Sequence, residues 1–222
     1  MPDDSVPGDP VPGPMFREAL VFLAEPWEYL GADEAIDLDH PLVQTTAARL
    51  PAGDGDAVFA RAAYELVRDT ITHSADAGDR RVTWRASDVL RERTGLCYAK
   101  SHAYVALLRA AGIPAGLCYQ RLARDETGSA HVLHGLTAVC LDGSWFRLDP
   151  RGDRPGVPAG AQAAFSLGEE RLAFVVRPGL GEVDYPQVYA SPAPAVLDAL
   201  RRHDDRRELC DGHLPAGLDP PR

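Results

Sequence analysis

Cys97 is the residue whose surroundings most favour chemical reactivity. Gly95 and Leu96 interrupt the helical pattern of residues 87–93, and a second helical pattern begins at or beside Cys97. Free backbone N–H groups and the positive dipole end of a helix stabilise a thiolate and can also bind an oxyanion. Lys100 lies three residues on, on the same helix face, and is expected to add to this effect. A lone cysteine is usually a small buried hydrophobe, but this context favours a nucleophile.

A hairpin turn indicates which histidine can meet a carboxylate. Asp142-Gly143 is a strong signal for a two-residue turn between antiparallel strands. With that turn, His134 and Asp149 become diagonal neighbours on one face, with α-carbons about 7–8 Å apart, a distance that their side chains can bridge. His131 points to the opposite face, so the turn selects His134 as the partner of Asp149.

The other six histidines have no obvious partner and are expected to be solvated or capping residues. They are His40, His73, His102, His131, His203 and His213. Nothing distinguishes Ser101 from ordinary helix-surface polarity. The sequence contains no serine-hydrolase elbow, zinc-protease helix motif or phosphate-binding loop.

The four cysteines give no signal for a metal site or a disulfide scaffold. None forms a CxxC pair, and four cysteines are few for a chain of 222 residues. Cys118 and Cys140 are expected to pack on strands, Cys140 beside Trp145, and Cys210 is expected to be exposed. We therefore expect free thiols in a reducing, cytoplasmic compartment, with no metal and no cofactor.

Composition excludes some partners. The formal net charge of −10 argues against a surface for nucleic acid or for an anionic membrane. No signal peptide is visible, and no apolar stretch approaches the length of a membrane span. The oligomeric state is left open.

Periodicity predicts one α+β domain. Helical spacing covers 56–70, 87–93 and 97–111, and a further helix runs from Ser191-Pro192 to about Arg202. Strand-like patterns cover 115–122, 131–141 and 145–148, and 174–177 adds a candidate. Asp56 is a plausible N-cap of the first helix. Helices followed by neighbouring strands are typical of an α+β fold with an antiparallel sheet.

The two ends of the chain differ from its middle. Residues 1–14 are rich in proline and are expected to be a flexible extension. Residues 15–203 are expected to form the single domain. Residues 204–222 are predicted to be a loosely packed polar tail, in which Leu209 and Leu214 could dock.

Two blocks resemble the core of bacterial transglutaminase-like proteins. The first is Thr-Gly-Leu-Cys-Tyr-Ala-Lys at 94–100, followed by the Leu-Leu-Arg-Ala-Ala-Gly-Ile-Pro run at 107–114. The second is His134-Gly135, followed by Asp-Gly-Ser-Trp-Phe-Arg-Leu-Asp at 142–149. The resemblance covers roughly residues 57–150, and the order and spacing of the blocks make it specific.

The resemblance implies a papain-like α+β fold in which the nucleophile helix packs on an antiparallel sheet. It assigns Cys97 as the nucleophile, His134 as general base and then acid, and Asp149 as the residue that orients His134. Cys97 joins the His–Asp pair through this resemblance alone. Family members often carry an aromatic residue directly after the histidine, where this chain has Gly135.

The implied activity is acyl transfer on a carboxamide or peptide bond by a small stand-alone bacterial enzyme, with a peptide, a protein or a small amide as substrate. Attack on the Cys97 thioester by an amine gives transamidation, and attack by water gives a cysteine peptidase or amidase. No segment is an obvious lid, so an open cleft is expected. A non-catalytic scaffold that binds a peptide or a partner is the other class, although it would be expected to lose one of the three residues.

Overall fold

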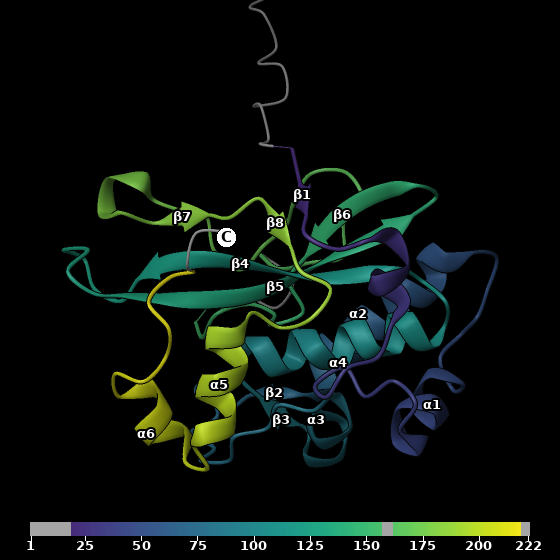
Figure 1. Ribbon diagram of the computed structural model, residues 1–222, viewed down its shortest axis with the longest axis horizontal. Helices are drawn as coiled ribbons and strands as arrows, with labels where there is room; N and C mark the ends of the chain where they lie inside the picture. The colour runs from purple at the N-terminus through teal and green to yellow at the C-terminus, as the bar shows by residue number, and fades with distance from the viewer. Residues whose placement is uncertain (1–18, 157–161, 219–222) are drawn as a thin grey trace, which may run out of the picture.

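Helix α4 (Cys97–Ala110) packs against the main sheet, with the other N-terminal helices around it, in the computed structural model, which describes residues 19–156 and 162–218 (Figure 1). The predicted extension at 1–14 lies outside these ranges. Every residue of α4 from Cys97 to Arg109 is buried, as expected for a helix in the core of a protein. The predicted helix is confirmed, and Gly112 follows its end with a φ of 78°.

Three further helices pack around α4 and around the short strand that precedes it. These are α1 (Pro41–Ala47), α2 (Asp56–Thr70) and α3 (Ala86–Glu92). The predicted bounds of α2 are confirmed, but the prediction of Asp56 as its N-cap is wrong. Gly55 takes the cap position with a φ of 119°, a conformation that favours glycine, and Asp56 begins the first turn. The left-handed cap of α3 is Arg93, while Gly95 continues into a strand.

Two short strands connect this helical layer to the start of α4. Strand β2 (Thr72–His73) follows α2 and pairs in parallel with β3 (Thr94–Gly95). His73 is the register partner of Gly95, and the N–H of Ser74 donates to the carbonyl oxygen of Gly95 over 3.0 Å. Gly95 lies two residues before Cys97, so this pairing places His73 beside the start of α4.

The main sheet confirms the predicted antiparallel arrangement. Its order is β6-β5-β4-β7, and its strands are β4 (Ala115–Ala123), β5 (His131–Leu141), β6 (Ser144–Leu148) and β7 (Val183–Asp184). Asp142 and Gly143 form the predicted turn with φ values of 49° and 74°, and the register begins with Leu141 opposite Ser144. The α+β fold class is therefore confirmed.

Both faces of the central strands are covered. The larger core lies between the sheet and the helices, and a smaller cluster on the other face includes Tyr29 and Cys118. Trp145 is opposite Cys140 as predicted, and its ring also packs against Tyr29. The remaining strands, β1 (Val21–Phe22) and β8 (Gln187–Val188), form a parallel pair, and 3-10 helices span Pro26–Leu30 and Pro178–Leu180.

The predicted strand at 174–177 is wrong, because this segment has no ladder partner. Its neighbour Ala173 instead donates its backbone N–H to the carboxylate of Asp149, and the ring of Phe174 packs edge-on against His134. Ala173 and Phe174 therefore pack against the pair formed by His134 and Asp149.

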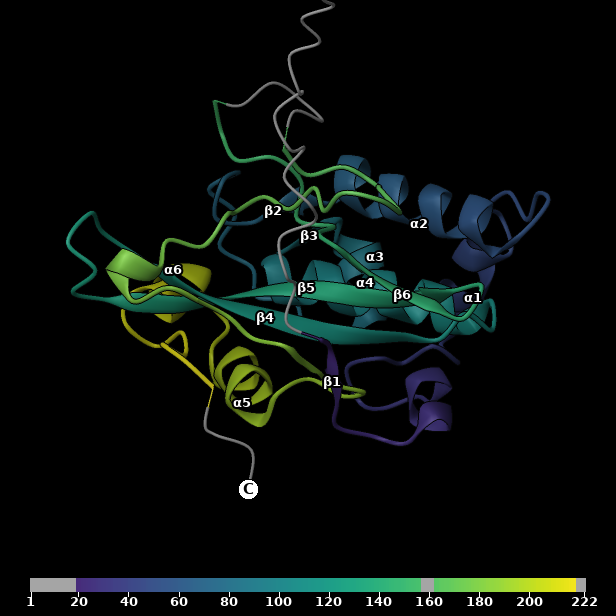
Figure 2. The ribbon, with the colours of Figure 1, turned by 90° about the horizontal axis from the view of Figure 1, so that it is seen from above.

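The C-terminal segment is packed on the domain. Helix α5 (Pro194–Arg202) begins after an Ala193 cap, later than predicted, and α6 (Arg206–Cys210) follows. Leu209 is fully buried, and the carbonyl oxygen of Pro215 accepts from the N–H of Leu133 over 2.8 Å. Figures 1 and 2 show α5 and α6 beside one end of α4 and α1 beside the other. Residues 204–218 are therefore not a loose tail. Among the described helices, none is long and apolar enough to cross a membrane.

Candidate active site

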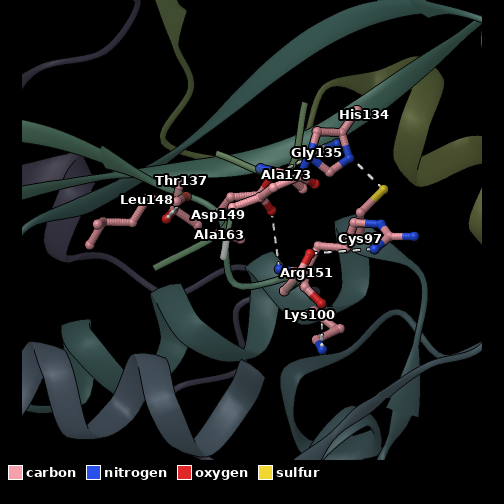
Figure 3. A network of polar contacts seen from close by, with 12 residues as sticks. Cys97, Lys100, His134, Gly135, Thr137, Leu148, Asp149, Arg151, Ala163 and Ala173 are labelled. Carbon is pink, nitrogen blue, oxygen red and sulfur yellow. Dashed lines mark hydrogen bonds and ion pairs between the residues drawn. The ribbon is translucent and has the colours of Figure 1, made fainter. Parts of the chain in front are cut away.

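Cys97 is the first residue of α4, where the helix leaves N–H groups without partners inside the helix. No side chain caps this end, and the N–H of Lys100 bonds to the carbonyl oxygen of Leu96 over 3.0 Å. The N–H of Gly135, from β5, donates to the sulfur of Cys97 over 3.4 Å (Figure 3). Helix dipole and N–H groups thus both favour negative charge at the sulfur.

His134 and Asp149 meet as the hairpin predicted. Nε2 of His134 lies 2.8 Å from Oδ2 of Asp149. The paired ladder ends at Thr137 and Leu148, so Asp149 comes one residue beyond the last pair. The carboxylate is fully buried and accepts two further bonds, from the N–H of Arg151 at 3.1 Å and from that of Ala173 at 3.0 Å. These donors hold the carboxylate in its ionised, acceptor-only form.

The charges of the cluster favour a thiolate–imidazolium pair. Burial raises the pKa of Cys97, but interactions with His134, and then with His73, outweigh it and lower that pKa to about 5. Burial lowers the pKa of His134, but the charges of Asp149 and Cys97 outweigh it and raise that pKa to about 10. The pKa of Asp149 is lowered: burial opposes ionisation, and the charge of His134 overcomes it. The structure thus brings Cys97, His134 and Asp149 together as expected.

His73 is the site residue that the sequence did not reveal. It was expected to be a solvated or capping histidine, but its interactions help to lower the pKa of the Cys97 thiol. Its Nδ1 lies 3.3 Å from Oδ1 of Asp76. A histidine followed three residues later by an aspartate, directly after a helix, was the available signal. Its pairing with β3 was not visible, because two-residue strands have no periodicity.

Arg151 links the two histidine–carboxylate pairs. Its guanidinium lies 2.9 Å from Oδ2 of Asp76, while its backbone N–H donates to Asp149. Only 8% of Arg151 is exposed. One residue thus fixes the carboxylate partners of both His73 and His134.

Lys100 has a different role from the one expected. Its ammonium is buried and donates to three backbone oxygens, those of Arg68 at 3.3 Å, Ile71 at 2.6 Å and Arg151 at 3.0 Å. Burial lowers its pKa to about 8. The lysine ties α4 to neighbouring segments, and the histidines, not Lys100, are the basic groups that lower the pKa of Cys97.

The remaining histidines lie outside the cluster. Nδ1 of His40 accepts from the N–H of Leu42 over 3.1 Å, so the expected cap is present. His102 is fully buried and bonded to the carbonyl oxygen of Trp84, so solvation is wrong for this residue. Nε2 of His131 is hydrogen-bonded to the carbonyl oxygen of Leu180, and the rings of His203 and His213 pack on each other. Ser101 is fully buried, not on the helix surface.

Gly135 is required by the close approach of β5 to α4. A Cβ at this position would lie 2.9 Å from Cδ1 of Tyr98 and 3.2 Å from its Cα. The backbone of α4 therefore leaves no room for a side chain after His134.

The sulfur is nearly enclosed, contrary to the expected open cleft. Only 7% of Cys97 is exposed, and α6 contributes Cys210, whose pKa is raised by burial and also by the charge of Cys97. Cys210 is half-buried against the core, not exposed as expected. Cys118 is buried as expected, Cys140 is partly buried, and all four thiols are free.

In comparisons with known proteins, the model of one family matches the part of the chain that carries this site. The model of the transglutaminase-like superfamily matches residues 44–150. No curated protein matches the chain. Similar solved structures include a protein from Cytophaga hutchinsonii proposed to be a cysteine protease, with 19% identity over 55% of this chain and 40% of that chain and a TM-score of 0.45. Another is the periplasmic domain of TgpA from Pseudomonas aeruginosa, with 18% identity over 56% of this chain and 46% of that chain and a TM-score of 0.42. This chain thus spans less than half of either structure.

Proposed function

Because residues 44–150 match the model of the transglutaminase-like superfamily, we propose that this chain transfers acyl groups from a carboxamide or peptide bond through a Cys97 thioester. The observation that carries the proposal is the contact chain at the N-terminus of α4. There the sulfur of Cys97 interacts with His134, whose Nε2 lies 2.8 Å from Asp149. A thiolate beside an imidazolium at a helix N-terminus is an activated nucleophile.

The first half-reaction forms the thioester. The Cys97 thiolate attacks the carbonyl carbon, and the negative charge that develops on oxygen is held by the N–H groups of the first turn of α4. His134 then gives its proton to the leaving nitrogen as the carbon–nitrogen bond breaks. Asp149 keeps the ring of His134 in the tautomer and orientation that this transfer needs.

The second half-reaction releases the acyl group to an acceptor. Neutral His134 takes a proton from an incoming amine or water molecule, which bonds to the carbonyl carbon as the carbon–sulfur bond breaks. The burial of Cys97, with 7% exposed, supports aminolysis, because excluding water is what lets an amine compete with it. The proposal is therefore transamidation, with hydrolysis by the same site as the alternative.

One experiment separates these reactions. The wild-type protein and Cys97→Ala are incubated with a glutaminyl peptide library, with and without a labelled primary amine. Label incorporated by the wild type and lost in the variant supports transamidation. Release of ammonia or cleaved peptide without incorporation supports hydrolysis, and no product in either assay contradicts both.

Thiol reactivity tests the catalytic proposal against a non-catalytic scaffold. Burial raises the pKa of Cys118 to about 12 and also raises that of Cys210, whereas that of Cys97 is lowered. We expect iodoacetamide at neutral pH to modify Cys97 first, and acid to suppress the reaction. If Cys97 reacts no faster than the other two cysteines, the scaffold is the better interpretation.

A further inference from the structure

Two histidines from different layers of the fold lower the pKa of the Cys97 thiol. His134 comes from β5 in the main sheet, and His73 comes from β2, beside β3 in the helical layer. Figure 1 shows β2 and β3 on the other side of α4 from β5. The backbone geometry fixes the second approach, because His73 pairs with Gly95, two residues before Cys97.

Each histidine has its own carboxylate. His134 has Asp149 at 2.8 Å, and His73 has Asp76 at 3.3 Å. Arg151 joins the carboxylates, with its guanidinium 2.9 Å from Asp76 and its N–H 3.1 Å from Asp149. Arg151 thus links two histidine–carboxylate pairs, of which the ordinary Cys-His-Asp arrangement uses only one.

We propose that His73, oriented by Asp76, is a second catalytic histidine, whose ring stabilises the sulfur of Cys97 as a thiolate from the helical layer while His134 transfers protons from the sheet. The inference deepens the proposed function by adding a residue to the same site.

Three further titratable groups around the sulfur are neutral at neutral pH. Tyr98 of α4, Tyr119 of β4 and Cys210 of α6 all interact with the charge of Cys97. Burial raises the pKa of each. Lys100 uses its ammonium on three carbonyl oxygens. Among these groups, the two imidazoles are the ones that lower the pKa of Cys97.

The role of His73 is electrostatic and needs no net proton transfer. When the thioester is resolved, the acceptor's nitrogen or oxygen bonds to the carbonyl carbon and its proton passes to His134. The carbon–sulfur bond then breaks, and its electron pair returns to sulfur. The ring of His73 stabilises that returning charge, and it stabilises the attacking thiolate equally in the first half-reaction.

The test is the pH dependence of Cys97 alkylation by iodoacetamide, followed on the Cys97 peptide by mass spectrometry. We expect His73→Gln to move the inflection of the rate upward by about one pH unit or more, because removing a group that stabilises the thiolate disfavours the ionised thiol. His73→Gln/His134→Gln should move it further than either single change. His131→Gln is the matched control, since His131 is a strand histidine bonded to Leu180, and its profile should coincide with that of the wild type.

The result that overturns the proposal is a His73→Gln profile that superposes on the His131→Gln profile, even if stability falls. Asp76→Asn keeps the ring and provides a second test should His73→Gln not fold. A smaller upward movement supports the proposal, and no movement overturns it. Alkylation needs no acyl substrate, so this outcome is independent of whether the amine-incorporation assay succeeds.

Discussion

The ammonium of Lys100 donates to the backbone oxygen of Arg151 over 3.0 Å, two residues beyond Asp149. Lys100 is the only lysine among the 23 basic residues of the chain. The same Nζ bonds to the carbonyl oxygen of Ile71, two residues before His73. A single side chain thus connects the nucleophile helix with the segments that carry the partners of both histidines.

Replacing this lysine tests that connection. Lys100→Met leaves three buried carbonyl oxygens without their donor, so we expect the free energy of unfolding to fall by about 1–3 kcal/mol. We also expect kcat to fall by about tenfold or more, because the loop after Asp149 loses its anchor. Denaturant unfolding and amine incorporation measure the two effects. Lys100→Arg should not restore activity, because a planar guanidinium does not match a compact site for an ammonium. Full activity in Lys100→Met would contradict the role.

The pH dependence of activity follows from the two opposite pKa changes at the thiolate–imidazolium pair. Because the pKa of Cys97 is lowered to about 5, the thiolate is present above that pH. Because the pKa of His134 is raised to about 10, its proton is present below that pH. We expect kcat/KM for a neutral peptide amide to rise through about pH 5, stay level and fall through about pH 10. An acidic limb near 8.5, the value of an ordinary cysteine, would show that the pair does not form.

Asp149→Asn should remove the orientation of the His134 ring without disrupting the fold. All three partners of this carboxylate donate to it, namely the ring of His134 and the N–H groups of Arg151 and Ala173. An amide placed there turns an N–H₂ group toward a donor, which favours the wrong tautomer of His134. We expect kcat to fall by about 10²–10⁴-fold with the fold retained by circular dichroism. Activity close to that of the wild type would rule out the orienting role.

Gly135→Ala tests the contact between β5 and the first turn of α4. The new Cβ would lie within 2.9 Å of Cδ1 of Tyr98, so the strand and the helix must separate. We expect a loss of about 1–3 kcal/mol in stability and slower alkylation of Cys97, whose sulfur accepts from the N–H of Gly135. Gly168→Ala is the matched control, because a Cβ there meets nothing within 4 Å, and it should change stability by less than about 0.5 kcal/mol. Equal behaviour of the two variants would contradict the steric argument.

Structural features that depend on residues close together in the sequence could be predicted. The helices α2 and α4 have strong periodicity, and the Asp142-Gly143 turn alone determines the register that brings His134 to Asp149. Residues that interact within a helix or across a hairpin are constrained by local geometry, and that geometry can be read from spacing. The position of Cys97 at a helix N-terminus is of the same kind.

Tertiary packing decided the rest. The pairing of β2 with β3 joins segments about twenty residues apart through two residues each, and it alone brings His73 to Cys97. The contacts of Arg151 with Asp76 and the burial of Leu209 likewise join distant parts of the chain. Such contacts have no local signature, because they form only when separate elements pack on a common core. The sequence by itself therefore indicated the nucleophile and its His–Asp pair, and the tertiary structure added the second histidine and enclosed the sulfur.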